Sequence, residues 1–170
     1  MASGDSLLIL HPNNASLPDT LAAGQEEIQG ASVPNEIIRV LAFDQTTVEY
    51  ADFRCILPSN YAGGGLTISV RWGAGLTTNL GIWAAAIRRI DDAEDLDTTI
   101  HTYVYQDTGD ITPPTVVGRA TTDNVALTSG AQMDSLLVDE DFILRIRRPA
   151  TTGTPVAADQ YLHSIHIKET

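Results

Sequence analysis

Residues 60–72 read NYAGGGLTISVRW, and the second half of this stretch alternates apolar and polar side chains. The apolar members, which share one side of an extended chain, are Leu66, Ile68, Val70 and Trp72. A period of two is typical of a half-buried β-strand. The glycines before it lack the Gly-Lys-Ser/Thr of a phosphate-binding loop, and a strand follows where a dinucleotide fingerprint needs a helix. We therefore interpret them as a β-turn that introduces the strand.

The rest of the chain after residue 36 also favours strands. Runs rich in β-branched and aromatic residues, bounded by Gly, Pro, Asn or Asp, predict strands at 37–43, 52–57, 66–72, 80–90, 98–106, 115–118, 123–127, 142–147 and 161–168. Only 130–138 has a helical character. These runs predict an all-β, antiparallel β-sandwich. Their length favours a jelly roll of about eight strands over an immunoglobulin sandwich, whose Cys-Trp-Cys spacing is missing.

Residues 1–36 differ from the body, 37–170. Their charges are all acidic, and after Leu10 they show no sustained period of 2 or 3.6. We expect an extended N-terminal arm that lies on a neighbour or on its own domain, with a short helix at 20–28 as an alternative. The body is then one jelly-roll domain.

Composition narrows the classes of partner. The net charge of −12 argues against direct nucleic-acid binding, which needs a basic face. No apolar run approaches the ~20 residues of a membrane-spanning helix, and the N-terminus lacks the basic start of a signal peptide, so we expect synthesis in a cytoplasm. A single cysteine, Cys55, cannot form an internal disulfide. Nine of the ten basic residues are Arg, which suits partly desolvated contacts with partners.

No motif predicts catalysis, a metal or a cofactor. The acidic run at 91–97 lacks the order of a calcium-binding EF-hand loop. His163 and His166 are three apart on a predicted strand and should face opposite sides, which separates them as metal ligands. There is no Gly-x-Ser-x-Gly elbow for a nucleophile. We predict a protein that is not an enzyme and acts by binding.

Tyrosines give one alternative for what is bound. Sugar-binding faces usually offer exposed aromatic rings, and Tyr103 and Tyr105 share a face with His101 on the predicted strand at 98–106. Tyr61 is a further candidate. Trp72 and Trp83 are predicted to lie in the core. A carbohydrate-binding β-sandwich module is therefore one reading of this sequence.

Three blocks, YADFRCILPSNYAGGGLTISVRW, GIWAAAIRRI and DEDFILRIRRP…DQYLHSIHIKE, resemble the small jelly-roll virion proteins of tailed bacteriophages. The resemblance implies a capsid decoration, or cement, protein on the capsid exterior of a virion. Such proteins bind between subunits of the major capsid protein and commonly form a homotrimer. A phage tail, baseplate or fibre component is the alternative within virions.

On the capsid reading, we predict that the partner is bound by an apolar stretch of the arm and by two pairs of arginines. These residues are Leu7, Leu8, Ile9, Leu10, Arg88, Arg89, Arg147 and Arg148. The arm could add a strand to a neighbouring sheet edge.

Overall fold

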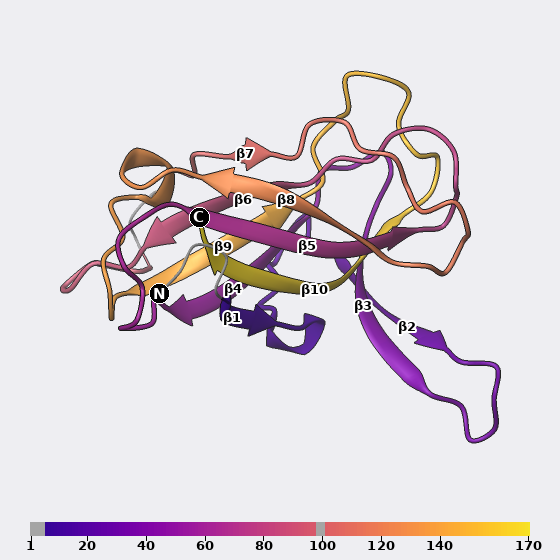
Figure 1. The fold of residues 1–170 in the computed structure, drawn as a ribbon, viewed down its shortest axis with the longest axis horizontal. Coiled ribbons are helices and arrows are strands. Elements are labelled where there is room, and N and C mark those ends of the chain that lie inside the picture. Colours follow the sequence, from indigo (N-terminus) through magenta and orange to yellow (C-terminus); the bar gives the residue numbers. More distant parts are fainter. Residues whose placement is uncertain (1–5, 98–100) are drawn as a thin grey trace.

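The computed structural model describes residues 6–97 and 101–170, and it shows two antiparallel sheets packed as a sandwich (Figure 1). The strands are β1 (Ser6–Leu10), β2 (Gly24–Gln29), β3 (Ile37–Phe43), β4 (Tyr50–Ile56), β5 (Leu66–Ala74), β6 (Ala84–Arg89), β7 (Gln106–Asp107), β8 (Thr121–Leu127), β9 (Asp141–Arg147) and β10 (Gln160–Glu169). Within these two ranges the only helices are two short 3₁₀ turns, η1 (Pro12–Asn14) and η2 (Ala131–Met133). The predicted all-β antiparallel sandwich is confirmed.

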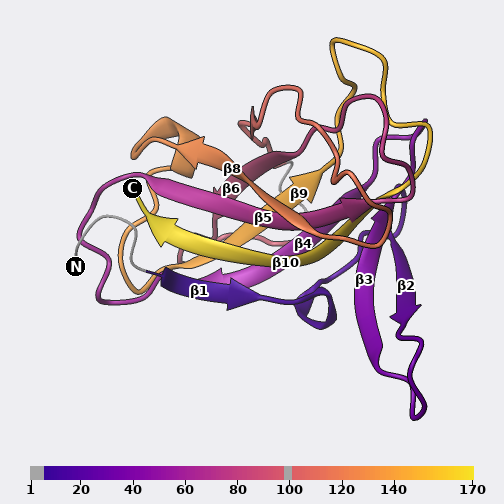
Figure 2. The same cartoon turned by 45° about the vertical axis from the view of Figure 1, so that its right-hand side comes forward.

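The large sheet has the order β2-β3-β10-β5-β8, and β1 also pairs with β10. One edge of β10 is shared, because its residues 160–162 pair with β3 and its residues 165–168 pair with β1. β3 diverges from β10 beyond this short contact. As a result the hairpin of β2 and β3 projects from the body, as Figure 2 shows. The small sheet has the order β4-β9-β6-β7.

The core fills the space between the two sheets. The four apolar residues of the opening stretch lie in β5 and are fully buried, as the alternation predicted. Trp72 and Trp83 are both buried, and their rings meet edge to face with centroids 6.1 Å apart. Trp83 also packs edge-on against Phe43 at 5.0 Å. This geometry is favourable for aromatic pairs, so the two indoles and Phe43 join the sheets at the centre of the sandwich.

The glycines before β5 form a turn for two separate reasons. Gly63 has φ of 100°, a conformation that side chains with a Cβ rarely adopt. Gly65 lies so close to β8 that a Cβ there would be 2.5 Å from the carbonyl oxygen of Leu127. The sequence indicated the turn, whereas the close approach to β8 depends on strand order that no local pattern contains.

Within residues 6–36, the part before the projecting hairpin lies on the chain's own body. β1 is a strand of the large sheet, in which Leu10 is buried while Leu7 and Leu8 pack against the core. The alternative helix at 20–28 is wrong, because Gly24–Gln29 pairs with β3 along its whole length. The expected boundary at residue 36 falls within the turn that joins β2 to β3. The segment therefore contributes β1 and β2 to the large sheet, and between them Ser16 and Ala22 form isolated bridges to β4 of the small sheet.

Three other sequence predictions differ from the structure. Of the strand at 98–106, residues 98–100 lie outside the described residues, 101–105 pair with no strand in the described part, and only Gln106–Asp107 form β7. Residues 115–118 form turns. The helical stretch at 130–138 stops after η2, because Asp134 and Ser135 take left-handed backbone angles that end a helix. No helix within 6–97 and 101–170 has the length and apolar character to cross a membrane.

Candidate functional site

The outer face of the small sheet gathers aromatic and charged side chains. Alternate residues of β4 and β9, such as Leu144, are buried in the core, so the residues between them point outward. The register sets Tyr50 opposite Arg147 and Asp52 opposite Arg145. Four outward side chains from two neighbouring strands therefore stand together on one surface.

Residues 101–105, here called the tyrosine segment, lie over this surface. In it Tyr103 and Tyr105 are half-buried, whereas Thr102 and Val104 are exposed. This is the alternation of an extended chain. The Arg145 guanidinium lies 4.2 Å from the ring centroid of Tyr103, and that of Arg147 lies 3.7 Å from the ring centroid of Tyr105. Both distances are within the range of cation–π attraction.

Asp52 orients the arginine at the centre of this layer. Its two carboxylate oxygens accept hydrogen bonds from Nε and Nη2 of Arg145, each at 2.6 Å. These bonds raise the pKa of Arg145, and its guanidinium also lies 5.5 Å from the ring of Tyr50. Burial raises the pKa of Tyr105 to about 12, against the opposing effect of the two arginines. The Tyr105 phenol is therefore protonated at neutral pH and able to donate a hydrogen bond.

Arg88 and Glu94 form a second ion pair at the end of this layer. Arg88 is 5% exposed, and its Nη2 lies 2.5 Å from Oε1 of Glu94. The same carboxylate oxygen lies 3.2 Å from Nδ1 of His101. The hydrogen bond from Arg88 lowers the pKa of Glu94, so this carboxyl is ionised at neutral pH. The pair fastens the 91–97 loop and the start of the tyrosine segment to β6.

The predicted partner-binding arginines have different surroundings. Arg89 pairs with Asp91 at 2.5 Å and with Glu140 at 3.2 Å. Arg148 is buried and donates to three backbone carbonyl oxygens, so it faces the interior of the isolated chain. The predicted apolar stretch of the arm lies in β1, on the other sheet. The structure thus brings Arg88 and Arg147 to one face, and it places the remaining predicted residues elsewhere.

Sequence reasoning missed three residues of this layer, Tyr50, Asp52 and Arg145. The alternation in the block DFILRIR could have placed Arg145 beside Arg147, because the two are separated by one residue on a strand. Asp52 and Tyr50 belong to β4, and only the register of β4 against β9 shows that they lie next to these arginines.

The two histidines of β10 are not on opposite faces. A β-bulge between Leu162 and Ser164 shifts the alternation, so that Leu162 and Ile165 both enter the core. His163 and His166 each follow one of these buried residues and lie outside the core. In the described part of the chain, no group of three or more His, Cys, Asp or Glu residues is arranged to hold a metal ion, and this includes the acidic loop at 91–97.

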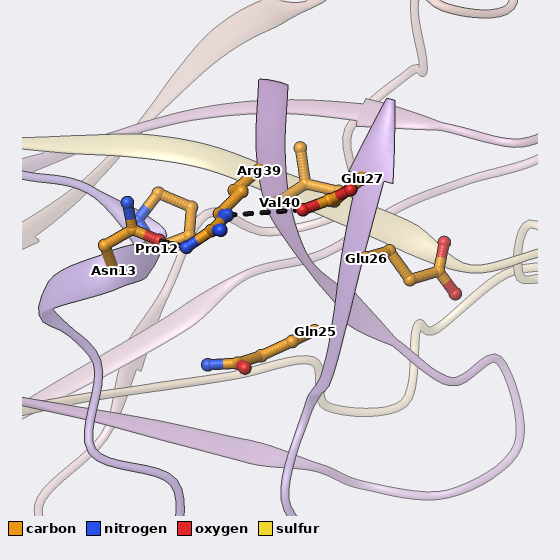
Figure 3. Close-up of a pocket in the computed structure, with 7 residues that line it drawn as sticks. All are labelled: Pro12, Asn13, Gln25, Glu26, Glu27, Arg39 and Val40. Carbon is orange, nitrogen blue, oxygen red and sulfur yellow. Dashed lines mark hydrogen bonds and ion pairs between the residues drawn. The ribbon is translucent and has the colours of Figure 1, made fainter. Parts of the chain in front are cut away.

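A hollow of about 630 Å³ separates the β2–β3 hairpin from η1 (Figure 3). Arg39 crosses it, donating to Glu27 on the neighbouring strand and to Asn13 of η1, both at 3.4 Å. Glu26 points away from these three side chains in Figure 3. The residues that line the hollow are polar or aliphatic, and none carries an aromatic ring. The tyrosine–arginine layer on the small sheet is therefore the better candidate for a ligand with both apolar and polar faces.

No protein-family model matches the sequence, and no curated protein matches it. Among solved structures the chain is similar to a family 35 carbohydrate binding module from Clostridium thermocellum, with 13% identity, 98% of this chain and 100% of that chain covered, and a TM-score of 0.56. It is also similar to a CBM35 from Cellvibrio japonicus (10% identity, 95% and 92% covered, TM-score 0.52). A third is the CBM22-1 xylan-binding domain from Paenibacillus barcinonensis (8% identity, 99% and 96% covered, TM-score 0.50).

These likenesses establish the fold of this chain as a jelly-roll β-sandwich. The three solved structures are carbohydrate-binding modules rather than capsid proteins. The resemblance to phage virion proteins is therefore supported for the fold, and the capsid-decoration identity gains no support from them.

Proposed function

We propose that this chain is a non-catalytic carbohydrate-binding β-sandwich that holds a saccharide against the outer face of its small sheet. The observation that carries the proposal is the layer of Tyr103 and Tyr105 over Arg145 and Arg147, with Asp52 fixing the central guanidinium. The similarity of the fold to carbohydrate-binding modules supports it.

The chemistry of this layer matches that of a sugar. A sugar ring has apolar C–H faces and a rim of hydroxyl groups, so it needs an aromatic surface with hydrogen-bonding groups around it. The half-buried rings of Tyr103 and Tyr105 provide the aromatic surface. The arginine forks donate hydrogen bonds in fixed directions, and the phenols can donate as well as accept.

The acids of this face are placed for structure rather than for hydrolysis. Two carboxyl groups carry out glycoside hydrolysis, and one of them must be a general acid with a raised pKa. Asp52 is held by two hydrogen bonds from Arg145. The pKa of Glu94 is lowered by Arg88, which is the opposite of what a general acid needs. These contacts support binding without catalysis.

Replacing Tyr105 should weaken saccharide binding more than it weakens the fold. We expect Tyr105→Ala to reduce affinity by about 10- to 100-fold, because burying a large side chain contributes roughly 1.5–3 kcal/mol and each 1.4 kcal/mol is tenfold. A glycan array identifies the bound saccharides, and isothermal titration calorimetry then measures wild type and variant against them.

Tyr161→Ala is the matched control, because Tyr161 is also half-buried but lies on β10 of the large sheet. We expect it to bind as the wild type does. If no glycan binds the wild-type chain, or if both variants lose affinity equally, this site assignment is wrong. Thermal unfolding of each variant checks that it is folded.

The capsid role is a second candidate, and the projecting hairpin favours it. Val33 at its tip is 91% exposed, and Ile37 and Ile38 are also exposed. Apolar side chains on a projecting element suit burial against another protein. On this proposal the chain decorates the exterior of a virion capsid, binds the major capsid protein and forms a homotrimer.

Self-association separates this candidate from the first. If the hairpin mediates a homotrimer, light scattering after gel filtration should give three times the chain mass at micromolar concentration. The double variant Val33→Ser, Ile38→Thr should then shift the protein to monomer, because it removes exposed apolar surface without touching the core. A wild-type chain that is monomeric throughout would count against the homotrimer.

A further inference from the structure

Arginines and tyrosines alternate along the outer face of the small sheet. Arg147 lies against the ring of Tyr105, and Arg145 lies against the ring of Tyr103. Arg88 continues the row on β6, one strand further. The three guanidinium groups are therefore neighbours in one layer.

Two of these three arginines have an acid of their own. Arg145 is bound by both oxygens of Asp52, and Arg88 is bound by Glu94. The third, Arg147, forms no ion pair or side-chain hydrogen bond with any residue in 6–97 or 101–170. Its Nε is buried and lacks a hydrogen-bond partner there. The unmatched charge stands at one end of the layer, beside Tyr105.

The neighbours of Arg147 explain why the fold leaves it unmatched. The register places Tyr50 on one side of it and Ala84 on the other. Neither side chain is a carboxylate. This happens in a chain with 22 acidic residues and a net charge of −12. No acid therefore stands directly opposite Arg147 on β4 or β6, although the chain as a whole is rich in acids.

A half-buried guanidinium without a counter-charge is unfavourable by itself. Arg stays protonated in proteins, so it cannot avoid the desolvation of its charge by losing a proton. An incoming anion offsets that penalty, and a planar carboxylate can accept two parallel hydrogen bonds from the guanidinium fork. The position of Arg147 thus favours a ligand that brings its own negative charge.

We propose that the saccharide bound at this face carries an acidic group, and that Arg147 binds that group while Tyr105 packs against the sugar. The proposal rests on the proposed function and names the ligand class of the same site. A uronic acid carboxylate matches the two-pronged geometry best. A sulfate ester offers the same chemistry of an anionic oxygen cluster, so the two sources of charge are separated by experiment.

The test compares acidic glycans with neutral versions of the same chains. Wild-type protein is first applied to an array of neutral, uronate-containing and sulfated glycans. Each acidic glycan that binds is then titrated beside its carboxyl-reduced or desulfated form by calorimetry. We expect the acidic form to bind at least about tenfold more tightly, because charge-assisted pairs are roughly twice as strong as neutral hydrogen bonds. The two neutral forms show whether a carboxylate or a sulfate is recognised.

Arg147→Gln should remove this preference, so that the acidic and neutral forms bind the variant with similar affinity, since the charge-assisted bond is lost. Arg54→Gln is the matched control. Arg54 is an exposed arginine on the same sheet, already paired with Asp141 at 2.6 Å, and its loss removes the same unit of charge. We expect Arg54→Gln to keep the preference for the acidic form. Thermal unfolding confirms that both variants are folded.

The outcomes separate this inference from the function on which it rests. Equal binding of acidic and neutral forms, or an acidic preference that survives in Arg147→Gln, would overturn the role of Arg147 and leave a carbohydrate-binding protein. If Arg147→Gln and Arg54→Gln lose the preference for the acidic form equally, the preference depends only on the net charge of the protein. That result would also overturn the role of Arg147. Failure to bind any glycan on the array would overturn the proposed function itself.

Discussion

Trp83→Ala is expected to lower the free energy of unfolding by about 3–5 kcal/mol, the range for removing a large aromatic side chain from a core. Trp83 is fully buried and packs edge-on against Phe43 at 5.0 Å and against Trp72 at 6.1 Å. A domain of this kind is stable by roughly 5–15 kcal/mol, so the loss is a large share of the total. Urea unfolding followed by far-UV circular dichroism measures it without depending on tryptophan emission.

Two phenylalanine variants test why the tryptophans are needed. The Nε1 of Trp83 has no hydrogen-bond partner in the described residues, so Trp83→Phe should lose only packing, less than about 2 kcal/mol. The Nε1 of Trp72 donates to Asp123 at 2.7 Å. Trp72→Phe removes that donor from a carboxylate, and we expect it to be more destabilising than Trp83→Phe by about 1.5–3 kcal/mol. The reverse order of the two variants would contradict this account of the core.

The sequence predicted those strands whose alternation results from burial. β5, β9 and β10 each place alternate residues in the core, and their patterns are visible without a structure. β2 was not predicted, because nearly all of its residues, GQEEIQ, are exposed and they show no apolar alternation. It is a strand because β3 supplies its hydrogen bonds within a projecting hairpin. Local composition cannot indicate a strand that pairing alone creates.

The site shows the same division between local and long-range information. Period two correctly put Tyr103 and Tyr105 on one side of their segment. The bond between Asp52 and Arg145 joins residues 93 positions apart, and any of the chain's acids could have been the partner as far as sequence shows. That Arg147 has no acidic partner is even harder to predict from sequence, because its neighbours on β4 and β6 must first be known.

Two adjacent arginines at the end of β9 have different environments. Arg147 is half-exposed, whereas Arg148, the next residue, is only 4% exposed. Its guanidinium donates to the carbonyl oxygens of Phe43 at 3.1 Å, Ala158 at 2.8 Å and Val156 at 2.8 Å. These bonds tie the end of β3 to the loop that leads into β10. Burial lowers the pKa of Arg148, because desolvation disfavours its charged form. The three hydrogen bonds offset this cost.

Arg148→Met is therefore expected to destabilise the fold by roughly 3–5 kcal/mol. Three carbonyls, two of them in buried hydrogen bonds, each lose a donor worth about 1–3 kcal/mol, and the removal of a buried charge offsets part of that. Arg148→Lys should be nearly as damaging, because an ammonium group lacks the planar fork that reaches three acceptors. Arg147→Met, one position earlier, should lose only about 0.5–1 kcal/mol from its contact with Tyr105. Urea unfolding of the three variants measures the difference. Equal destabilisation at 147 and 148 would mean that the carbonyl bonds of Arg148 do not hold the β3 end and the loop together.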